Sequence, residues 1–188
     1  MINKVTLKNW KSHLNTTLVF SSGTNALVGI MGSGKSSVLD AISFALFGSF
    51  PYLQSRKVKI DDVIMKKPIV QNRAEVEVHL TFGGSNYVIK RCIERGKGTT
   101  YAEIIKDNQI IESGSSSRVS EIVEKILKTN YELFSKAIYS EQNSLDYFLT
   151  LPTGQRMKKI DELLMLDKFD IVRSNLVALL NKIMSRKE

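Results

Sequence analysis

Nine residues near the amino terminus, Gly29 to Ser37, read GIMGSGKSS and have the spacing of a phosphate-binding loop. The pattern is a glycine, four residues and then Gly-Lys-Ser, which here are Gly29, Gly34, Lys35 and Ser36. Glycines let backbone N–H groups turn inward around an anion, and a helix that begins at the loop adds the positive end of its dipole. The lysine supplies a charge for the terminal phosphates, and the serine hydroxyl can ligate magnesium. The stretch therefore predicts binding of ATP with Mg²⁺.

One side chain of this loop is unusual for such a site. Met31 is a bulky thioether that cannot donate a hydrogen bond, although its backbone N–H remains available to a phosphate. Binding is therefore still expected. The loop residues predicted to contact the nucleotide are Met31, Gly32, Ser33, Gly34, Lys35, Ser36 and Ser37.

Other parts of a hydrolytic site are missing from the 188 residues. Hydrolysis needs an acidic residue after an apolar strand to hold the metal and the water, and no apolar run of four ends in Asp-Glu. The sequence Leu-Ser-Gly-Gly, which would clamp a γ-phosphate from another subunit, is also absent. The nearest approach is Ser113-Gly114-Ser115, which we interpret as linker. The site is expected to be incomplete in this chain.

The loop must be held by the elements on either side of it. A short apolar strand is predicted over residues 24–30 and is expected to be buried, and a strongly apolar helix follows over 36–48 and ends at Gly48. Alternating residues and glycine turns predict further strands, most of them in an antiparallel meander, at 2–9, 16–20, 74–82, 86–94, 101–108 and 109–111.

The remaining segments give weaker patterns. Residues 51–73 predict a loop with a possible short helix, and 114–117 a linker. A helix is predicted over 120–128, with Ser120 near its amino-terminal end. Residues 131–139 fit either a helix or a strand.

The chain changes character past Pro152. Apolar residues then recur at spacings of 4, 3, 4, 3 and 4, the pattern of a coiled-coil seam, although a helix packed on its own domain would also show it. Because the pattern runs to the last residues without a Gly or Pro stop, we expect the sequence to be cut from a longer protein. We predict two parts, an ATPase lobe over 1–150 and the base of a coiled-coil helix over 151–188. The seam residues are Met165, Phe169, Val172, Leu176, Leu179 and Ile183.

Composition narrows the class of protein. A hydrophobic share of 43% excludes a disordered chain, and a formal net charge of +8 favours an anionic partner such as nucleic acid, although many solvated surfaces are also basic. The single cysteine, Cys92, cannot form an internal disulfide, which indicates a reducing compartment. We interpret Cys92 itself as a small residue of the core. With no apolar run of 18 residues and no signal-peptide core, we expect a soluble intracellular protein without membrane contact.

Four motifs occur in an order that is typical of one family. They are KNWKSH at 8–13, the stretch at 29–48, AIYSEQNSLDYFL at 137–149 and the stretch at 151–170. With these motifs the chain resembles the N-terminal lobe of the ABC-type, SMC-like ATPase of the double-strand-break repair complex, the Rad-fifty-type subunit and its bacterial exonuclease relative. The resemblance implies a P-loop NTPase of α+β or α/β class, with an antiparallel meander, the loop's strand and helix, and the start of a coiled-coil helix.

The resemblance implies roles for residues outside the loop. Gln142 matches the family's Q-loop glutamine, which contacts Mg²⁺ and the attacking water, so catalytic roles are expected for Lys35 and Gln142, and metal contacts for Ser36 and Gln142. Lys11 and Ser12 match residues that approach the nucleotide. The family's usual Asn at position 31 offers hydrogen bonds that methionine lacks, which puts sensing of the γ-phosphate in doubt. A further family segment that contacts the nucleotide falls near Ile64, Met65 and Lys66.

The resemblance also implies what completes the site. In this family a C-terminal lobe carries the metal-binding acid, the catalytic glutamate and the signature loop, and two heads enclose two ATP molecules as a homodimer. The fragment alone is then expected to be inactive as an ATPase. A zinc hook at the coiled-coil tip needs a Cys-x-x-Cys pair, so Zn²⁺ belongs only to the full-length protein. A repair nuclease of the Mre-eleven type is expected at the outer face of helix 153–188.

Double-stranded DNA is the other partner that the resemblance implies, which places the protein in the cytoplasm and nucleoid or in a nucleus. Engaged heads of the family bind duplex across their N-terminal lobes, through contacts that are independent of sequence and sensitive to salt. Each basic residue could equally be a solvated surface charge. The candidates for DNA contact are Arg56, Lys57, Lys59, Lys66, Lys67, Lys90, Arg91, Arg95 and Lys97.

Two other functions remain open from the sequence. An SMC-type ATPase that structures chromosomes would use the same nucleotide chemistry. The nucleotide-binding domain of an ABC transporter would share the loop, but a heptad helix after Gln142 is not expected there, where a compact helical subdomain and a signature loop would follow.

Overall fold

The computed structural model describes residues 1–139, 152–163 and 166–185. The chain divides into two compact units, Met1–Ser135 and Lys136–Glu188. The boundary predicted at 150/151 lies outside the described residues, and so does Gln142.

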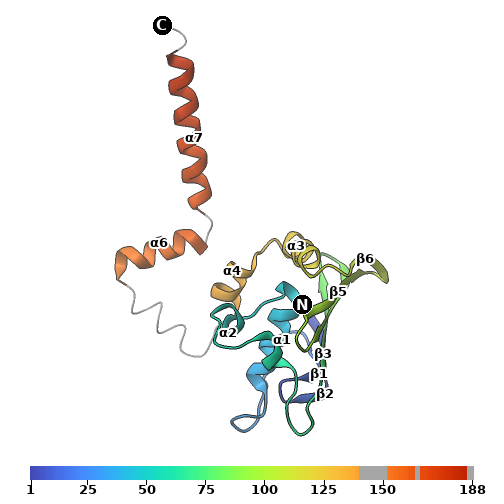
Figure 1. Cartoon of the computed structure of the whole chain (residues 1–188). Helices are drawn as coiled ribbons and strands as arrows, with labels where there is room; N and C mark the ends of the chain where they lie inside the picture. The colour runs from blue at the N-terminus through green and yellow to red at the C-terminus, as the bar shows by residue number, and fades with distance from the viewer. Residues whose placement is uncertain (140–151, 164–165, 186–188) are drawn as a thin grey trace. The chain divides into compact units, whose positions relative to one another are not determined.

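The first unit is built on a six-stranded antiparallel sheet (Figure 1). Its strands lie in the order β2-β1-β3-β4-β5-β6, so every neighbour except the β1–β3 pair follows directly along the chain. The predicted meander is confirmed. The strands are β1 (Ile2–Trp10), β2 (His13–Val19), β3 (Arg73–Phe82), β4 (Ser85–Glu94), β5 (Gly98–Lys106) and β6 (Gln109–Ser113).

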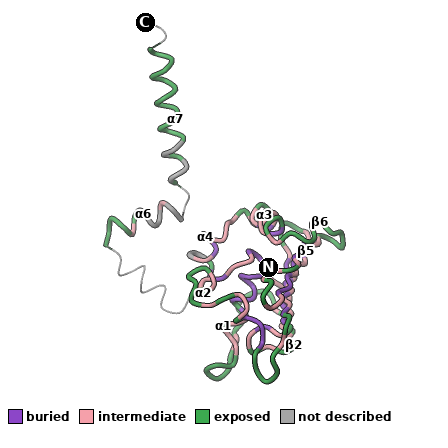
Figure 2. Tube along the Cα trace, in the orientation of Figure 1, coloured by how far each residue is buried: buried purple, intermediate pink, exposed green. Residues whose placement is uncertain are grey.

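Strict alternation gives the central strands one apolar and one polar face. In the β1–β3 register, Val5 lies opposite Val78 and Leu7 opposite Val76, and all four side chains are at most 1% exposed. The residues between them along each strand point to the other face and remain partly exposed, as the alternating colours along the sheet show (Figure 2). The apolar face of the sheet is therefore one wall of the core.

Helix α1 (Lys35–Phe47) covers that wall and carries the phosphate-loop motif at its first residues. It contacts β1, β3 and β4 and buries nine of its residues. The helix ends at Gly48, whose left-handed backbone (φ 70°) lets its N–H donate to the carbonyl of Phe44. Trp10 is fully buried against the rings of Phe44 and Phe50, and its indole N–H donates to the Ser37 carbonyl at 2.9 Å. The helix was predicted from the sequence, over residues 36–48.

Helix α3 (Ser116–Leu127) packs beside α1 and against β5 and β6. It begins four residues earlier than predicted, within the segment interpreted as a linker. Ser115 explains the difference, because its hydroxyl accepts a hydrogen bond from the Arg118 N–H and caps the helix. Ser120, which was placed near the amino-terminal end, lies inside the helix and donates to the Phe47 carbonyl at the end of α1.

The strand predicted before the loop is absent. Residues 24–30 have neither helical nor strand structure, and Val28 and Ile30 are 93% and 83% exposed. A buried strand needs a neighbour for its backbone groups, and this segment pairs with none of the six strands of the sheet. The apolar pattern was present in the sequence, but the pairing it needs is not supplied by the described residues.

The connection between α1 and β3 contains short helices that pass near the β1–β2 turn. Residue Ile64, directly after η1, forms an isolated antiparallel bridge with Trp10. The short elements of this connection are α2 (Pro51–Gln54) and the 3₁₀ helix η1 (Ile60–Val63). Two further short elements follow α3, namely α4 (Tyr131–Leu133) and the π-helix η2 (Phe134–Ile138).

The second unit contains two helices, α6 (Thr153–Leu163) and α7 (Asp167–Met184), where one continuous helix was predicted. The Leu166 N–H donates to the Asp161 carbonyl five residues earlier, which departs from the regular helical pattern. Five of the predicted seam residues lie on α7, each between 54% and 71% exposed, and Met165 lies outside the described residues. Their pairing in a coiled coil stays a prediction. Across the described residues, no helix has both the length and the apolar character that a membrane crossing requires.

Candidate nucleotide-binding site

The loop at 29–34 turns through two left-handed glycines before α1 begins. Gly32 and Gly34 have φ angles of 81° and 93°, which favour glycine over every other residue. Gly34 is also the N-cap residue of α1. A Cβ atom at Gly34 would lie 2.5 Å from the Ser12 hydroxyl oxygen and 2.6 Å from Nε2 of His13. The sequence therefore needs glycine here for two reasons, the backbone angle and the close approach of the β1–β2 turn.

A hollow of about 330 Å³ opens between the loop, the first turn of α1 and the β1–β2 turn. The free N–H groups at the start of a helix point outward along its axis, and the helix dipole adds positive potential there, so this position favours an anion. No acidic residue lies in the first turn of α1 to oppose it. The residues that line the hollow are Lys11, Ser12, Gly32, Gly34, Lys35, Ser36 and Ser37.

Six of the seven residues predicted in the loop are either part of this lining or support it. Ser33 is the supporting residue, with its hydroxyl 3.4 Å from the Lys35 ammonium. Met31 is different, since its side chain is 98% exposed and does not line the hollow. Any contact of Met31 with a phosphate would therefore use its backbone N–H.

The Lys35 side chain folds back over the loop. Its ammonium donates to the carbonyls of Gly29 at 2.7 Å and Ile30 at 2.8 Å. These neutral acceptors hold the charge beside the hollow, and a phosphate oxygen would be a stronger acceptor for the same group. The arrangement places the Lys35 ammonium beside the hollow in which the terminal phosphates of a nucleotide are expected.

The β1–β2 turn supplies the second wall of the hollow. Lys11 has a left-handed backbone (φ 49°), and its N–H donates to the Val63 carbonyl at 2.6 Å. Its ammonium pairs with the carboxylate of Asp40 on α1. Lys11 and Ser12 both line the hollow, and their contact with a nucleotide stays a prediction.

The segment at 64–66 lies behind this turn. Ile64 and Met65 are buried at 0% and 1% exposure, and the Met65 N–H donates to the Asn9 carbonyl. Lys66 is exposed and pairs with Asp62 at 2.7 Å, and this hydrogen bond is the main reason that the pKa of Asp62 is lowered. Contacts of Ile64, Met65 and Lys66 with a nucleotide stay a prediction.

Within the described ranges, Ser36 is the residue of the hollow that we consider as a ligand for a hard metal ion accompanying a nucleotide. Ser36 is exposed at the first turn of α1 and lines the hollow, so its hydroxyl is available as an oxygen ligand. The described residues contain no group of three or more His, Cys, Asp or Glu side chains that would hold a metal by themselves. A metal at Ser36 would therefore depend on phosphate oxygens and on ligands from elsewhere.

Arg91 was predicted to contact DNA, and that prediction is wrong. The side chain is fully buried because the alternation of β4 points it toward the core. It donates to the carbonyls of Ala45 and Leu46 at the end of α1, and also to the Ser116 carbonyl and to the hydroxyls of Ser116 and Ser120 on α3. Burial lowers the pKa of Arg91 to about 10, so the group stays charged at neutral pH. It is a cation that joins the carboxyl end of α1 to α3.

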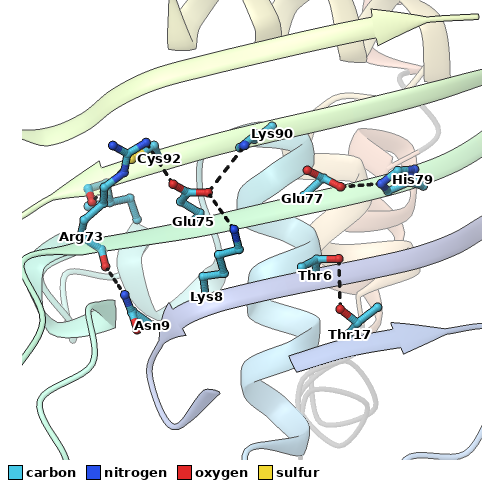
Figure 3. A network of polar contacts seen from close by, with 11 residues as sticks. Thr6, Lys8, Asn9, Thr17, Arg73, Glu75, Glu77, His79, Lys90 and Cys92 are labelled. Atoms are coloured by element: carbon cyan, nitrogen blue, oxygen red, sulfur yellow. Dashed lines mark hydrogen bonds and ion pairs between the residues drawn. The ribbon is translucent and has the colours of Figure 1, made fainter. Parts of the chain in front are cut away.

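Lys90, the neighbouring candidate, lies on the polar face of the sheet. Its ammonium is 3.6 Å from a carboxylate oxygen of Glu75, which also pairs with Arg73 and Lys8 (Figure 3). One carboxylate therefore balances several cations on this face. In the same view, Nε2 of His79 lies 2.6 Å from a carboxylate oxygen of Glu77.

Arg95 and Lys97, two further candidates for DNA contact, lie at the hairpin tip between β4 and β5. Arg95 turns inward and donates to the Gln71 carbonyl at 2.9 Å, whereas the side chain of Lys97 is 71% exposed. The pKa of Lys97 is raised, chiefly by its hydrogen bond with Glu94. Of the remaining basic candidates, all are exposed: Arg56, Lys57, Lys59, Lys66 and Lys67.

Two residues of the site were not expected to act there. Asp40 was not singled out, although one acidic residue within the apolar run SSVLDAISFALFG was a visible signal. His13 ends the motif at 8–13, and its Nε2 lies 3.1 Å from the Gly34 carbonyl oxygen. His13 contacts the loop, and Asp40 contacts Lys11, which lines the hollow. Both contacts arise from tertiary packing, which the spacing of residues in the sequence does not show.

Comparison with known proteins places the chain in a family. The family model described as an AAA domain matches residues 4–188. The DNA double-strand break repair Rad50 ATPase of Thermoplasma volcanium is 36% identical over 173 residues, which cover 90% of this chain and 18% of that protein. The protein of the same name from Thermococcus kodakarensis is 31% identical over 185 residues, which cover 98% of this chain and 20% of that protein. The chain thus spans about a fifth of the length of these relatives.

A solved structure shows the same fold. A chain from work on the ATP-driven dimerization and DNA-stimulated activation of SMC ATPases superposes with a TM-score of 0.66 at 23% identity, covering 86% of this chain and 98% of that one. The fold class predicted from the sequence, a P-loop ABC-type N-terminal lobe, is confirmed by this likeness and by the antiparallel sheet with its loop and helix. The resemblance to Rad50-type repair ATPases is also confirmed by the relatives. The chain belongs to the AAA domain family, whose model it matches over nearly its whole length.

Proposed function

We propose that this chain is the ATP-binding half of the ATPase head of a DNA double-strand-break repair protein. The observation that carries the proposal is the hollow formed by the glycine loop, the first turn of α1 and the β1–β2 turn, with two lysines at its walls. The relatives with the same motifs are named as Rad50 repair ATPases and support the biological assignment.

The residues divide the work of binding between them. The backbone N–H groups of the loop and the start of α1 surround the phosphates, and Lys35 leaves its carbonyl acceptors to neutralise the terminal ones. Ser36 offers its hydroxyl to the Mg²⁺ that accompanies ATP, and that ion would neutralise charge on the phosphates. Gln142 is proposed, from the family motif, to orient the attacking water.

The chain supplies only part of the hydrolytic site, and its own surface supports that view. The segment 24–30 exposes Val28 and Ile30 directly before the loop, although its apolar pattern is that of a buried strand. A neighbouring strand from a C-terminal lobe would satisfy its backbone and cover these side chains. That lobe would also bring the acidic residues that hold the metal and activate water.

Further partners follow from the same proposal. Two heads would close on two ATP molecules, exposed basic residues such as Lys57 and Lys97 would contact DNA phosphates, and the exposed stripe of α7 would pair with a returning coiled-coil helix. A repair nuclease would bind at the base of that coiled coil, and a zinc hook would lie at its far end. The protein would act where the DNA is, in the nucleoid or a nucleus.

The direct test compares the chain alone with the complete head, meaning this chain together with its C-terminal lobe. The complete head is expected to hydrolyse ATP slowly in the presence of Mg²⁺, and residues 1–188 alone are expected to show no turnover above a Lys35→Ala control. Appreciable hydrolysis by the chain alone would show that the site is complete without a second lobe, against the proposal.

A chromosome-structuring SMC function is the second candidate, because the solved SMC-type head shares this fold. The two functions differ in what binds the base of the coiled coil. A repair head should retain a nuclease through the surface of α6 and α7, whereas an SMC head should bind a kleisin-type subunit instead. Affinity purification of the full-length protein, with and without residues 153–184, separates these outcomes.

A further inference from the structure

Asp40 is a buried acid in the middle of the helix that carries the phosphate loop. Its side chain is 3% exposed, and it lies four residues after Ser36, so both residues lie on the same face of α1. A buried carboxylate is costly unless it is paired and hydrogen-bonded. An acidic residue in this otherwise apolar stretch therefore needs a partner for its charge.

The cation that pairs with Asp40 is Lys11, one of the residues lining the hollow. The Lys11 ammonium lies 2.5 Å from a carboxylate oxygen of Asp40 and 4.9 Å from the centre of the Phe50 ring. The backbone of Lys11 is fixed as well, by its hydrogen bond to the Val63 carbonyl. The ammonium is therefore held by the carboxylate and the ring, on a residue whose backbone is itself fixed and whose side chain is 24% exposed.

This arrangement differs from an ordinary lysine on a protein surface. A free lysine distributes its ammonium over many rotamers and must give up that freedom when it contacts a ligand. Here the carboxylate and the ring have already removed most of it. The pair is also shielded from solvent, so the charge of Lys11 is screened less than that of an exposed residue.

We propose that Asp40 is a positioning residue for the nucleotide site, which holds the Lys11 ammonium at the wall of the hollow so that it can act on a bound phosphate. The inference rests on the proposed function, since it assumes that the hollow takes ATP. Asp40 itself does not line the hollow and acts through Lys11. The alternative is a purely structural pair that fastens the β1–β2 turn to α1.

A double-mutant cycle separates these two roles. The four proteins are the complete head with its natural residues, Asp40→Asn, Lys11→Met and the variant with both changes. The affinity for ATP–Mg²⁺ is measured by titration calorimetry, and the unfolding temperature without nucleotide is measured beside it. The double variant removes both charges together, so it leaves neither an unpaired acid nor an unpaired lysine.

The positioning role predicts coupled losses of affinity. Asp40→Asn and Lys11→Met are each expected to weaken ATP binding about tenfold, the order of one charge-assisted hydrogen bond. Adding Asp40→Asn to Lys11→Met is expected to cause no further loss. Lys11→Arg keeps the charge and a donor for the Asp40 carboxylate, and is expected to retain affinity within about threefold. If Asp40→Asn fails to fold, the comparison of Lys11→Arg with Lys11→Met still tests whether the charge of residue 11 acts on the nucleotide.

Other results would overturn the inference. If Asp40→Asn lowered affinity equally in both backgrounds, or only lowered the unfolding temperature, the pair would be structural. If Lys11→Arg lost as much affinity as Lys11→Met, the charge of residue 11 would not act on the nucleotide. Glu94→Gln is the matched control, because it removes the acid of another lysine pair, with Lys97, outside the hollow. Failure of the natural protein to bind ATP would instead refute the proposed function.

Discussion

The ring Nε2 of His13 lies 3.1 Å from the carbonyl oxygen of Gly34, the last residue before α1. The other ring nitrogen lies 3.1 Å from the Thr16 hydroxyl, so β2 fixes the orientation of the imidazole. In a planar trans peptide the C=O and N–H bonds point in opposite directions. A contact that fixes the Gly34 carbonyl therefore also fixes the following N–H, that of Lys35, on the side of the hollow. The β1–β2 turn and the phosphate loop are one packed unit.

Gly34→Ala is expected to damage this unit more than a change at the other left-handed glycine of the loop. The new Cβ atom would lie within 2.6 Å of Ser12 and His13 atoms and would also strain the backbone. We expect a loss of about 2–4 kcal/mol in unfolding free energy, measured by chemical denaturation of the complete head.

Gly32→Ala is the matched control for that experiment. Its φ of 81° gives the same kind of strain, but no atom lies within 4 Å of the added Cβ. The expected loss is therefore about 1–2 kcal/mol, from strain alone. Equal losses at Gly32 and Gly34 would contradict the close packing of the β1–β2 turn against the loop.

Arg91→Met is expected to destabilise the fold without any direct effect on DNA contact. The change removes five hydrogen bonds in the described part of the chain and leaves the carbonyls of Ala45 and Leu46 without this donor. A loss of about 3 kcal/mol in unfolding free energy is expected, because buried acceptors are left unsatisfied. Lys90→Met, on the same strand but on the partly exposed face, should cost less than about 1 kcal/mol.

The pH dependence gives a second check on Arg91. Burial lowers the folded-state pKa of Arg91 from its ordinary value to about 10, so the unfolded chain binds more protons than the folded one only above about pH 10. Stability attributable to this group therefore rises as the pH increases beyond about 10 and is constant below. The difference between Arg91→Met and the natural protein should stay level from pH 6 to pH 9, roughly within measurement error. A steep change there would mean that Arg91 has a different charge state.

Lys97→Ala is expected to weaken DNA binding by the engaged heads, whereas Arg95→Ala should act mainly on stability. Lys97 points into solvent at the hairpin tip, while Arg95 donates to the Gln71 carbonyl. Loss of one phosphate contact should reduce the slope of log affinity against log salt by about 0.9. Fluorescence anisotropy with a labelled duplex at several salt concentrations measures that slope. An unchanged slope would remove Lys97 from the DNA surface.

The local pattern of residue types along the chain was sufficient to predict most of the fold. The meander followed from strict alternation and glycine turns, and α1 followed from an apolar run that ends at Gly48. Arg91 shows a pattern that was present but not used, since it alternates with Tyr87, Ile89 and Ile93 on the buried face of β4. A basic residue that alternates with apolar residues along a strand should be predicted to be buried before it is considered for DNA contact.

Other features could not be predicted from local pattern because they depend on partners. Residues 24–30 have the composition of a strand, but a strand forms only where another strand accepts its hydrogen bonds. The contacts of Asp40 with Lys11 and of His13 with Gly34 join residues at least 21 positions apart. The loop itself could be recognised because all its chemistry lies in nine consecutive residues.

We propose that this loop binds ATP and that the bound ATP drives two heads together. The most direct measurement is the molar mass of the complete head by size-exclusion chromatography with light scattering, with ATP and Mg²⁺ present. The natural protein is expected to give the mass of a dimer, and Lys35→Ala the mass of a monomer, because the ammonium that neutralises the terminal phosphates is gone. A Lys35→Ala protein that still dimerised with ATP would contradict the account.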